Sequence, residues 1–320
     1  MSSDSRSRED LQLESVDRTA PASTISDEQR QTESTFGFKW AKRDTYESEA
    51  MRNTAREWLF ERYCGGDPQL LADWLSGGRK KILDAGCGAG FSAMLFFGDH
   101  LRSHDYIGAD ISDAAYVAQE RFKEAGYPGT FIKRDLLDLP IEDGSVDMIF
   151  SEGVLHHTDS TERALKALAP KLRQGGRFLF YVYAKKAVIR EFTDDAIRDR
   201  LRLLSDEDAW KALEPLTKLG IALGELGIEL TVPEDIPYLG IKAGKLDIQR
   251  FFYWNICKVF YRHQLTLDEM NHINFDWFRP LNCHRQTPEQ VSSWCREAHL
   301  QIERSDVQEA GITVVARREL

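Results

Sequence analysis

The glycine-rich segment ILDAGCGAGF, residues 82–91, carries residue types suited to holding a ligand. An apolar run that predicts a strand precedes its three glycines, and residues that predict a helix follow them. Glycines in such a turn let a ligand approach the backbone, and the helix that follows presents free amides. A dinucleotide site of the GxGxxG type needs its third glycine at position 91, where Phe91 stands. The segment therefore predicts a nucleotide-like ligand and disfavours a nicotinamide dinucleotide.

Acidic residues end the apolar runs that follow this segment. Asp110 ends YIGAD, where a carboxylate can accept hydrogen bonds from both ribose hydroxyls of a nucleoside. Asp135 ends TFIKRD, and Glu152 ends VDMIFSE. Ligands of open α/β sheets bind at the carboxyl ends of the strands, so these side chains are expected to face one cleft.

Two adjacent histidines, His156 and His157, follow the VDMIFSE run. Histidine is the common general base near neutral pH, so one interpretation is proton transfer; the other is packing of the loop or shaping of a substrate pocket. Tyr183, at the end of RFLFYVY, is the third candidate for a catalytic group. The cysteines and histidines between residues 283 and 299 match no regular zinc spacing, so no metal site is predicted.

Apolar runs alternate with helical stretches from Lys81 to Tyr183, which predicts an α/β fold with a mostly parallel sheet and helices on both faces. A capping box at Thr287 opens a closing helix, and two short strands follow it. Residues 1–34 lack large apolar side chains and are expected to form a mobile, disordered tail. The predicted parts are this tail over 1–34, an N-terminal helical lid over 35–79, the α/β core over 80–183, a helical cap over 184–286, and the closing helix and strand pair over 287–320.

The acidic-x-Gly-x-Gly-x-Gly loop, Asp110, the pair Asp135-Leu136 and the segment SEGVLHH together resemble the class I S-adenosylmethionine-dependent methyltransferases of small-molecule type. The resemblance covers about residues 80–183, with a weaker match in the closing helix and strands. It implies a Rossmann-like fold: a seven-stranded, mostly parallel sheet with an antiparallel C-terminal strand pair and a helical cap inserted after the fifth strand. It also implies S-adenosylmethionine as cofactor, with Asp110 on the ribose and Asp135 on the adenine amine. The cofactor-binding residues that it implies are Asp84, Gly86, Cys87, Gly88, Gly90, Phe91, Asp110, Ile111, Asp135, Leu136, Ser151, Glu152 and Gly153.

The methyl acceptor is expected to lie between the lid and the cap, from which this family builds its substrate site. The substrate-binding candidates are Trp40, Trp277, His284 and Arg285, the last two being able to pair with a carboxylate or phosphate. DNA base methyltransferases carry an Asn/Asp-Pro-Pro-aromatic run where SEGV stands here, and protein arginine methyltransferases carry two glutamates. A small-molecule acceptor is therefore favoured, with the methylated atom (O, N, C or S) left open.

Two other functions stay open for the same cofactor site. One is an intramolecular cyclisation of the cofactor's aminoalkyl chain that releases methylthioadenosine. The other is a non-catalytic module that binds S-adenosylmethionine and reports its level to a partner. Cyclisation and methyl transfer can be told apart by product, since cyclisation releases methylthioadenosine and methyl transfer releases the homocysteine product.

Composition bears on the partners and on the compartment. A formal net charge of -10 disfavours nucleic acid, whose recognition needs a concentrated basic surface. No apolar run approaches the roughly 18 residues that span a membrane, and the N-terminus lacks the apolar segment of a secretory signal. The five cysteines form no CxxC pair, which favours free thiols in the cytoplasm. The oligomeric state is not predicted by any of these features.

Overall fold

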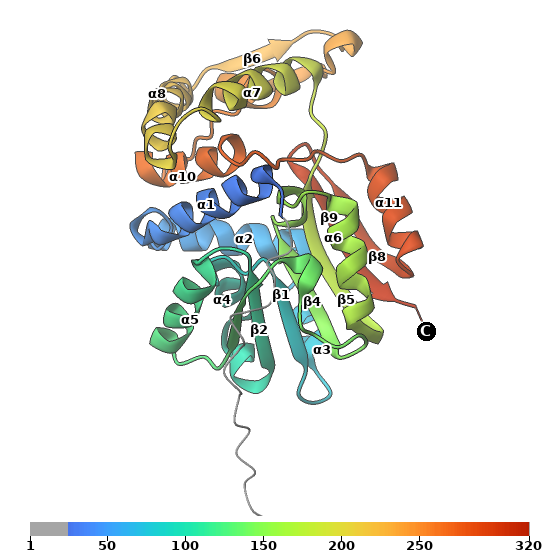
Figure 1. The fold of residues 1–320 in the computed structure, drawn as a ribbon. Coiled ribbons are helices and arrows are strands. Elements are labelled where there is room, and N and C mark those ends of the chain that lie inside the picture. The colour runs from blue at the N-terminus through green and yellow to red at the C-terminus, as the bar shows by residue number, and fades with distance from the viewer. Residues whose placement is uncertain (1–24, 320) are drawn as a thin grey trace, which may run out of the picture.

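The computed structural model describes residues 25–319, and its centre is a seven-stranded sheet (Figure 1). The strands are β1 (Lys81–Ala85), β2 (Asp105–Asp110), β3 (Thr130–Lys133), β4 (Val146–Glu152), β5 (Leu172–Tyr183), β8 (Leu300–Val307) and β9 (Gly311–Arg318). They lie in the order β3-β2-β1-β4-β5-β9-β8. The first five are parallel, and β9 runs antiparallel to both of its neighbours. The predicted Rossmann-like sheet with an antiparallel C-terminal pair is confirmed.

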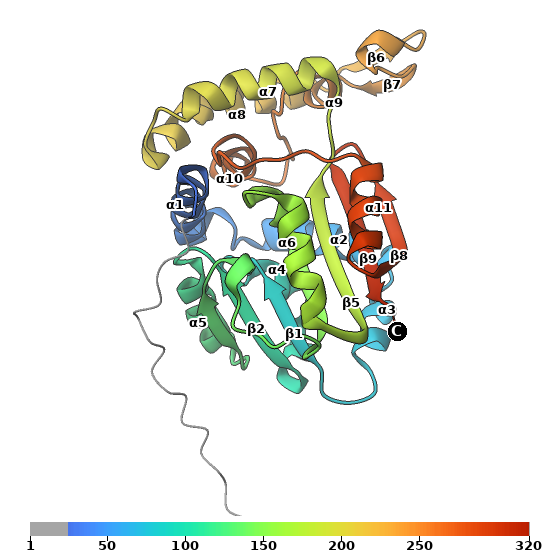
Figure 2. The ribbon, with the colours of Figure 1, turned by 45° about the vertical axis from the view of Figure 1, so that its right-hand side comes forward.

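Helices cover both faces of this sheet (Figure 2). One face packs on α2 (Glu49–Cys64), α3 (Pro68–Leu75), α4 (Phe91–Phe97) and α5 (Ala114–Ala125). The other face packs on α6 (Thr161–Leu168) and α11 (Pro288–Glu297). The predicted capping box at Thr287 is present: its hydroxyl accepts from the Gln290 amide, and the Gln290 side chain accepts from the Thr287 amide. Both faces are covered, which is why the central parts of β1, β4 and β5 are apolar and buried.

The first helix, α1 (Asp27–Ala41), corrects the prediction of a disordered tail over residues 1–34. Residues 27–34 are its first two turns, capped by the Ser26 hydroxyl, which accepts from the Gln29 amide. The polar side chains of this segment are buried through hydrogen bonds: Thr32 accepts from the Asn282 amide at 3.2 Å, and Gln29 accepts from the Asn282 side chain at 3.1 Å. A criterion based on apolar surface could not detect such burial. Residues 1–24 of the predicted tail lie outside the described residues.

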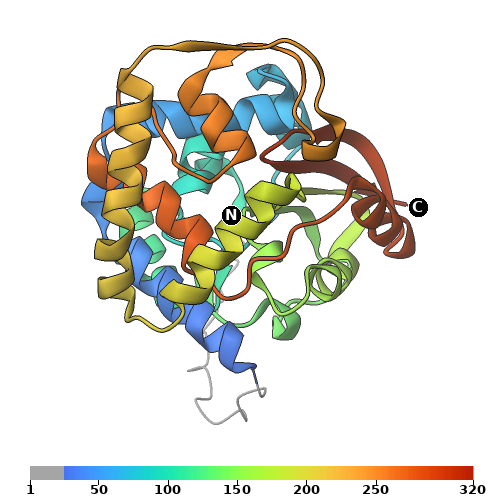
Figure 3. The ribbon, with the colours of Figure 1, turned by 90° about the horizontal axis from the view of Figure 1, so that it is seen from above.

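After β5 the chain leaves the sheet and builds a cap above its carboxyl edge (Figure 3). The cap contains α7 (Val188–Leu201), α8 (Asp206–Glu225), α9 (Ile248–Asn255) and α10 (Leu267–Phe278). A short antiparallel pair, β6 (Glu229–Val232) with β7 (Gly244–Asp247), also lies here, although no strand is expected in this region from the sequence. Within residues 25–319, no helix combines the length and apolar character that a membrane crossing requires.

Candidate active site

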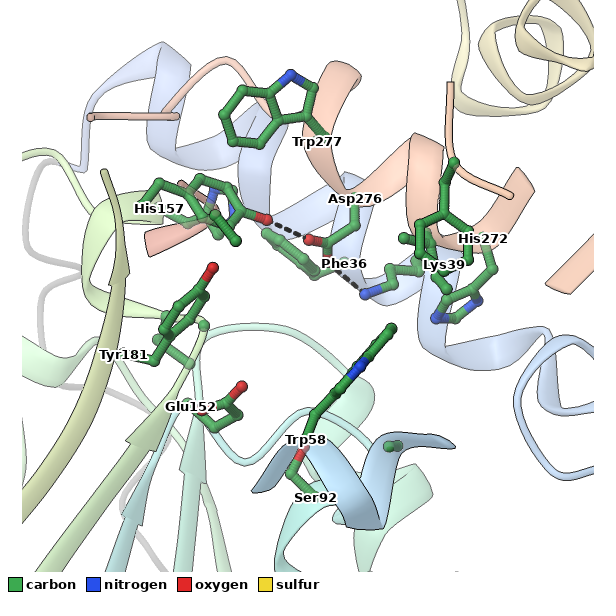
Figure 4. A pocket seen from close by; sticks show the side chains of 18 of the residues that line it. Phe36, Lys39, Trp58, Ser92, Glu152, His157, Tyr181, His272, Asp276 and Trp277 are labelled. Carbon is green, nitrogen blue, oxygen red and sulfur yellow. Dashed lines mark hydrogen bonds and ion pairs between the residues drawn. The ribbon is translucent and has the colours of Figure 1, made fainter. Parts of the chain in front are cut away.

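A cavity of about 480 Å³ lies between the carboxyl edge of the sheet, α1 and the cap. Small-molecule sites have volumes of roughly 300–1,000 Å³, so the cavity can take a nucleoside and part of a second molecule. Figure 4 shows Glu152 and Tyr181 at the sheet edge, with Asp276 and Trp277 of α10 on the opposite wall. Of the residues predicted from the sequence, those that line it are Gly86, Phe91, Asp110, Ile111, Asp135, Leu136, Glu152, Gly153, His157, Tyr183, Trp40 and Trp277.

The glycine-rich turn lies below the cavity and only partly lines it. Gly86, Gly88 and Gly90 all have positive φ, at 88°, 49° and 69°. A Cβ on Gly88 would come within 2.7 Å of the Trp40 indole nitrogen, so α1 packs directly on this turn. Cys87, Gly88 and Gly90 do not line the cavity, since Trp40 covers Gly88 and Phe122 lies next to Gly90. In this structure they shape the turn beneath the cavity, and their contact with the cofactor stays a prediction.

Asp110 lies at the end of β2 and lines the cavity, although it is only 9% exposed. Its carboxylate accepts from the Gly88 amide at 2.9 Å and from the Ser112 amide and hydroxyl at 2.8 and 2.7 Å. Burial raises its pKa. A carboxylate has about four acceptor positions, so about one is left for a ligand hydroxyl, where the sequence predicts that it accepts from both ribose hydroxyls.

Asp135 and Leu136 stand just after β3 and line the cavity, as Phe91 does. Asp135 accepts from the Leu137 amide through one carboxylate oxygen at 2.9 Å, which leaves the other oxygen free to accept from an amine. Leu136 and Phe91 are both buried apolar side chains. An acceptor beside two apolar walls fits the amine and the ring of an adenine.

Two predicted cofactor residues, Asp84 and Ser151, lie beneath the site and do not line the cavity. Asp84 is 2% exposed and accepts from the Tyr106 hydroxyl at 2.6 Å. Burial raises the pKa of Asp84 to about 7. Ser151 is fully buried and donates to the Ala85 carbonyl at 2.8 Å. Each side chain is held by a neighbouring strand, so both stabilise the sheet here, and their contact with the cofactor stays a prediction.

Glu152 is the last residue of β4, Gly153 follows it, and both line the cavity. The Glu152 carboxylate accepts from the Tyr63 hydroxyl at 2.6 Å and pairs with the Arg62 guanidinium. Arg62 in turn lies over the Tyr181 ring, 4.0 Å from its centroid. Arg62 and Tyr63 of helix α2 thus position Glu152. Glu152 is predicted from the sequence, and the two residues that hold it are not.

Lys39, Asp276 and Tyr183 form a polar group on the side of the cavity nearest the cap. The Tyr183 hydroxyl donates to Asp276 at 2.6 Å, and the Lys39 ammonium pairs with the same carboxylate (Figure 4). The Lys39 charge holds the pKa of Asp276 well below its usual range against the effect of burial. Sequence reasoning missed Lys39 and Asp276. One signal was present, because Asp276 is the only charged residue within the apolar run INFDWF.

The two histidines differ in their environment. His156 is fully buried, does not line the cavity, and stacks on Tyr183 with ring centroids 3.8 Å apart. His157 lines the cavity, and its Nδ1 lies 2.6 Å from the Asn282 carbonyl oxygen. That contact requires a proton on Nδ1 and leaves Nε2 as an acceptor, for which the described residues provide no partner. Burial lowers the pKa of His157 to about 4, so the imidazole is neutral at pH 7.

His284 and Arg285 do not line this cavity, which corrects their prediction as substrate-binding residues. They lie in a separate surface depression near α11. Arg285 is paired with Glu191 at 2.8 Å and with Asp195 at 2.7 Å, and His284 contacts the Thr158 carbonyl oxygen. The charge of Arg285 is thus used to attach α7 to the segment before α11.

Comparisons with known proteins agree with this geometry. Residues 83–180 match the family model described as a methyltransferase domain. The chain is 40% identical over 139 residues to an uncharacterized protein of Synechococcus, covering 41% of this chain and 31% of that protein. It is 32% identical over 127 residues to the probable tRNA methyltransferase 9B of Mus musculus, covering 39% of this chain and 26% of that protein. The chain spans less than half the length of the curated relatives it matches.

A solved structure extends the likeness to nearly the whole chain. The magnesium protoporphyrin IX methyltransferase of Synechocystis with bound S-adenosylmethionine is 11% identical, has a TM-score of 0.50, and is covered in full by 93% of this chain. At this identity the likeness bears on the fold. The family match spans most of the five parallel strands, the glycine turn and the acids at the ends of β2 and β3. Residues 83–180 are therefore a methyltransferase domain, and the described part of the chain has the Rossmann-like fold of the class I S-adenosylmethionine-dependent methyltransferases.

Proposed function

We propose that this chain is a cytoplasmic enzyme that transfers a methyl group from S-adenosylmethionine to a small molecule enclosed beneath the cap. The observation that carries the proposal is that one cavity joins the two parts of such a reaction. At one end it is lined by Gly86, Asp110 and Asp135, and at the other by Asp276 and Trp277. The buried free cysteines support a reducing compartment.

Two observations favour a small acceptor over a nucleic acid. The cavity lies between the sheet edge and the cap, and its apolar and aromatic walls suit a molecule that is largely surrounded. With a net charge of -10, the chain lacks the excess of basic residues that recognition of many phosphates needs. The similarity to a tRNA methyltransferase covers 39% of this chain, so tRNA is the alternative acceptor to test.

The residues of this chain fit the roles that methyl transfer requires. Bound S-adenosylmethionine supplies a methyl group on a positively charged sulfur, already activated for displacement. Asp110 and Asp135 hold the nucleoside at the ends of β2 and β3. Glu152, fixed by Arg62 and Tyr63, presents a negative charge toward the region where a sulfonium would lie. Because the donor is activated, the main contributions of the protein are orientation and exclusion of water.

His157 is the proposed general base. Its Nε2 is buried, lacks a partner among the described residues, and belongs to a side chain that lines the cavity. The Asn282 carbonyl fixes the tautomer in which this nitrogen accepts a proton from an acceptor O–H or N–H. Tyr183, which donates to Asp276, positions the acceptor with its ring and oxygen. His156 packs against Tyr183 and does not line the cavity, so we do not propose it as the base.

The first experiment incubates the protein with methyl-labelled S-adenosylmethionine and either a metabolite extract or total tRNA. Label in a small metabolite, together with release of S-adenosylhomocysteine, is the expected result. Label in tRNA would replace the small acceptor by a nucleic acid. Methylthioadenosine as product would indicate cyclisation of the cofactor, and tight binding with no product would indicate a non-catalytic module.

The second experiment compares His157→Gln with His263→Gln, a substitution of an exposed histidine. Loss of a general base lowers kcat by about 10²–10⁴-fold, and the control is expected to keep the wild-type rate. S-adenosylmethionine affinity, measured by calorimetry, verifies that the variant is folded. Equal rates for both variants would remove His157 from catalysis and leave methyl transfer itself in place.

A further inference from the structure

The end of the cavity farthest from the glycine turn gathers positive charge around one indole ring. Four cationic groups lie near the centroid of Trp277: Lys186 at 5.3 Å, Arg190 at 5.4 Å, Arg198 at 4.9 Å and Lys258 at 5.3 Å. Of these, Lys186, Arg190 and Lys258 line the cavity. Cation–π contact stabilises each of them only modestly, so the charges need further partners.

The acids of this region are already engaged elsewhere. Asp194 pairs with Arg190 at 2.6 Å and also accepts from the Trp277 indole at 2.8 Å. Asp276 is paired with Lys39. These contacts neutralise Arg190 and leave the two lysines without an acidic partner.

Lys186 and Lys258 use only part of their hydrogen-bonding capacity. The Lys186 ammonium donates to the carbonyls of Glu309 and Ala310 in the turn between β8 and β9. The Lys258 ammonium donates to the Ile273 carbonyl at 2.8 Å. Within residues 25–319 neither has a carboxylate within ion-pair distance. An ammonium has three N–H donors, so three donors of the pair remain for a ligand.

The pKa values of the two lysines are shifted in the direction that an anion would reverse. Burial lowers the pKa of Lys186 and of Lys258 to about 7 in each case, and the nearby Arg190 acts in the same direction. An anion within hydrogen-bond distance stabilises the charged ammonium and raises its pKa. Asp276 and Asp194 offset part of this effect at Lys258, as Glu191 does at Lys186, and an anion bound between the lysines would stabilise their charged forms further.

We propose that Lys186 and Lys258 form an anion subsite, which binds a carboxylate or phosphate group of the methyl acceptor next to Trp277. This inference rests on the proposed function and narrows its substrate to an anionic small molecule. The aromatic walls beside the two lysines, Tyr253 and Phe260, suit an acceptor whose anion is attached to an apolar or planar body. An acceptor that is charged along its whole length would place no apolar surface against Tyr253 and Phe260.

The test uses calorimetric titration of the protein saturated with S-adenosylhomocysteine. The probes are benzoate and phenyl phosphate, with benzamide as the uncharged match. Both anions are expected to bind more tightly than benzamide. Lys258→Met and Lys186→Met are each expected to weaken anion binding by about tenfold or more, the effect of removing a charge-assisted hydrogen bond. The control Lys242→Met changes an exposed lysine that pairs with Asp235, and it is expected to bind the anions as the wild type does.

Each outcome decides the proposal. Tighter binding of benzoate identifies a carboxylate site, and tighter binding of phenyl phosphate identifies a phosphate site. No anion binding by the wild type, or equal binding by Lys258→Met, overturns the subsite. A loss of S-adenosylhomocysteine affinity in both lysine variants also overturns it, because the lysines would then hold the carboxylate of the cofactor. Anion binding without methyl transfer to any acceptor would count against the proposed function and leave the subsite intact.

Discussion

The two ends of the cavity are built in different ways. At the sheet end, marked by Gly86, Asp110 and Asp135, the polar groups stand at the ends of adjacent parallel strands and are held largely by backbone amides. At the cap end, Asp276 is paired with the Lys39 side chain of a distant segment, and Lys258 donates to the Ile273 carbonyl. The partners of Asp110 lie within 22 residues of it, whereas Lys39 and Asp276 are 237 residues apart.

This difference suggests that the sheet end keeps the same ligand in related proteins, whereas the cap end can change its ligand. Backbone amides at strand ends depend on the fold and little on side-chain identity, so the sheet end can serve the same donor in many proteins. Side-chain pairs can be exchanged one at a time, so the cap end can be adapted to a particular acceptor. Substitutions at the two ends should therefore separate donor binding from stability and acceptor binding.

The largest expected effect is at the cap end. Asp276→Ala leaves the Lys39 ammonium, whose side chain is 5% exposed, without its partner. Breaking a buried pair in this way is expected to lower the free energy of unfolding by about 3 kcal/mol, measured by urea denaturation. The double variant Lys39→Met with Asp276→Ala should recover part of that loss. Equal destabilisation by the single and double variants would show that the pair does not hold α1 to α10.

The next effect is at the sheet end. Asp110→Ala removes the acceptor for the ribose and also releases the Gly88 amide, so S-adenosylmethionine affinity is expected to fall about 100-fold. Titration calorimetry measures this directly. Asp113→Ala is the matched control, because Asp113 is a nearby exposed acid paired with Lys133. If both variants bind the cofactor as the wild type does, Asp110 is not a cofactor residue.

A pH effect follows from Asp84, beneath the sheet end. Its folded pKa of about 7 exceeds the unfolded value, so the folded state binds more protons between about pH 4 and pH 7. This acid therefore lowers stability as pH rises through that range, and Asp84→Asn removes the dependence. Between pH 5 and pH 8 the variant is expected to gain about 2 kcal/mol relative to wild type, measured by urea denaturation at both values. A constant difference between the two proteins would contradict the raised pKa.

The smallest effect concerns the contact that joins the two ends. Trp40→Phe shortens the side chain that lies on Gly88 while keeping an aromatic ring against Tyr46. Loss of about 1 kcal/mol of packing corresponds to a rise of about fivefold in the KM for S-adenosylmethionine, with kcat unchanged. A change in kcat alone would place Trp40 at the acceptor instead of the donor.

The same comparison explains what could be predicted from the sequence. The strands, the glycine turn and the acids Asp110 and Asp135 were predictable because apolar runs and the residues at their ends are local signals. Lys39 and Lys258 were not, since their positions depend on how the cap folds over the sheet. Arg285 was placed wrongly for the same reason: its partners Glu191 and Asp195 lie on α7, far away in the sequence. The paired strands β6 and β7 are too short to give a clear period.

The polar burial of α1 also bears on how ligands enter. The contacts of Gln29 and Thr32 with Asn282 are hydrogen bonds, which water can replace at little net free energy. The second half of the helix is anchored differently, through Phe38 and Trp40 and the pair of Lys39 with Asp276. Separation of the first two turns from the segment at 279–282 therefore exposes little apolar surface. The first two turns of α1 can therefore separate from the cap while the second half stays attached, and little apolar surface that could cause aggregation is exposed. Amide hydrogen exchange in α1 should be faster before residue 35 than after it.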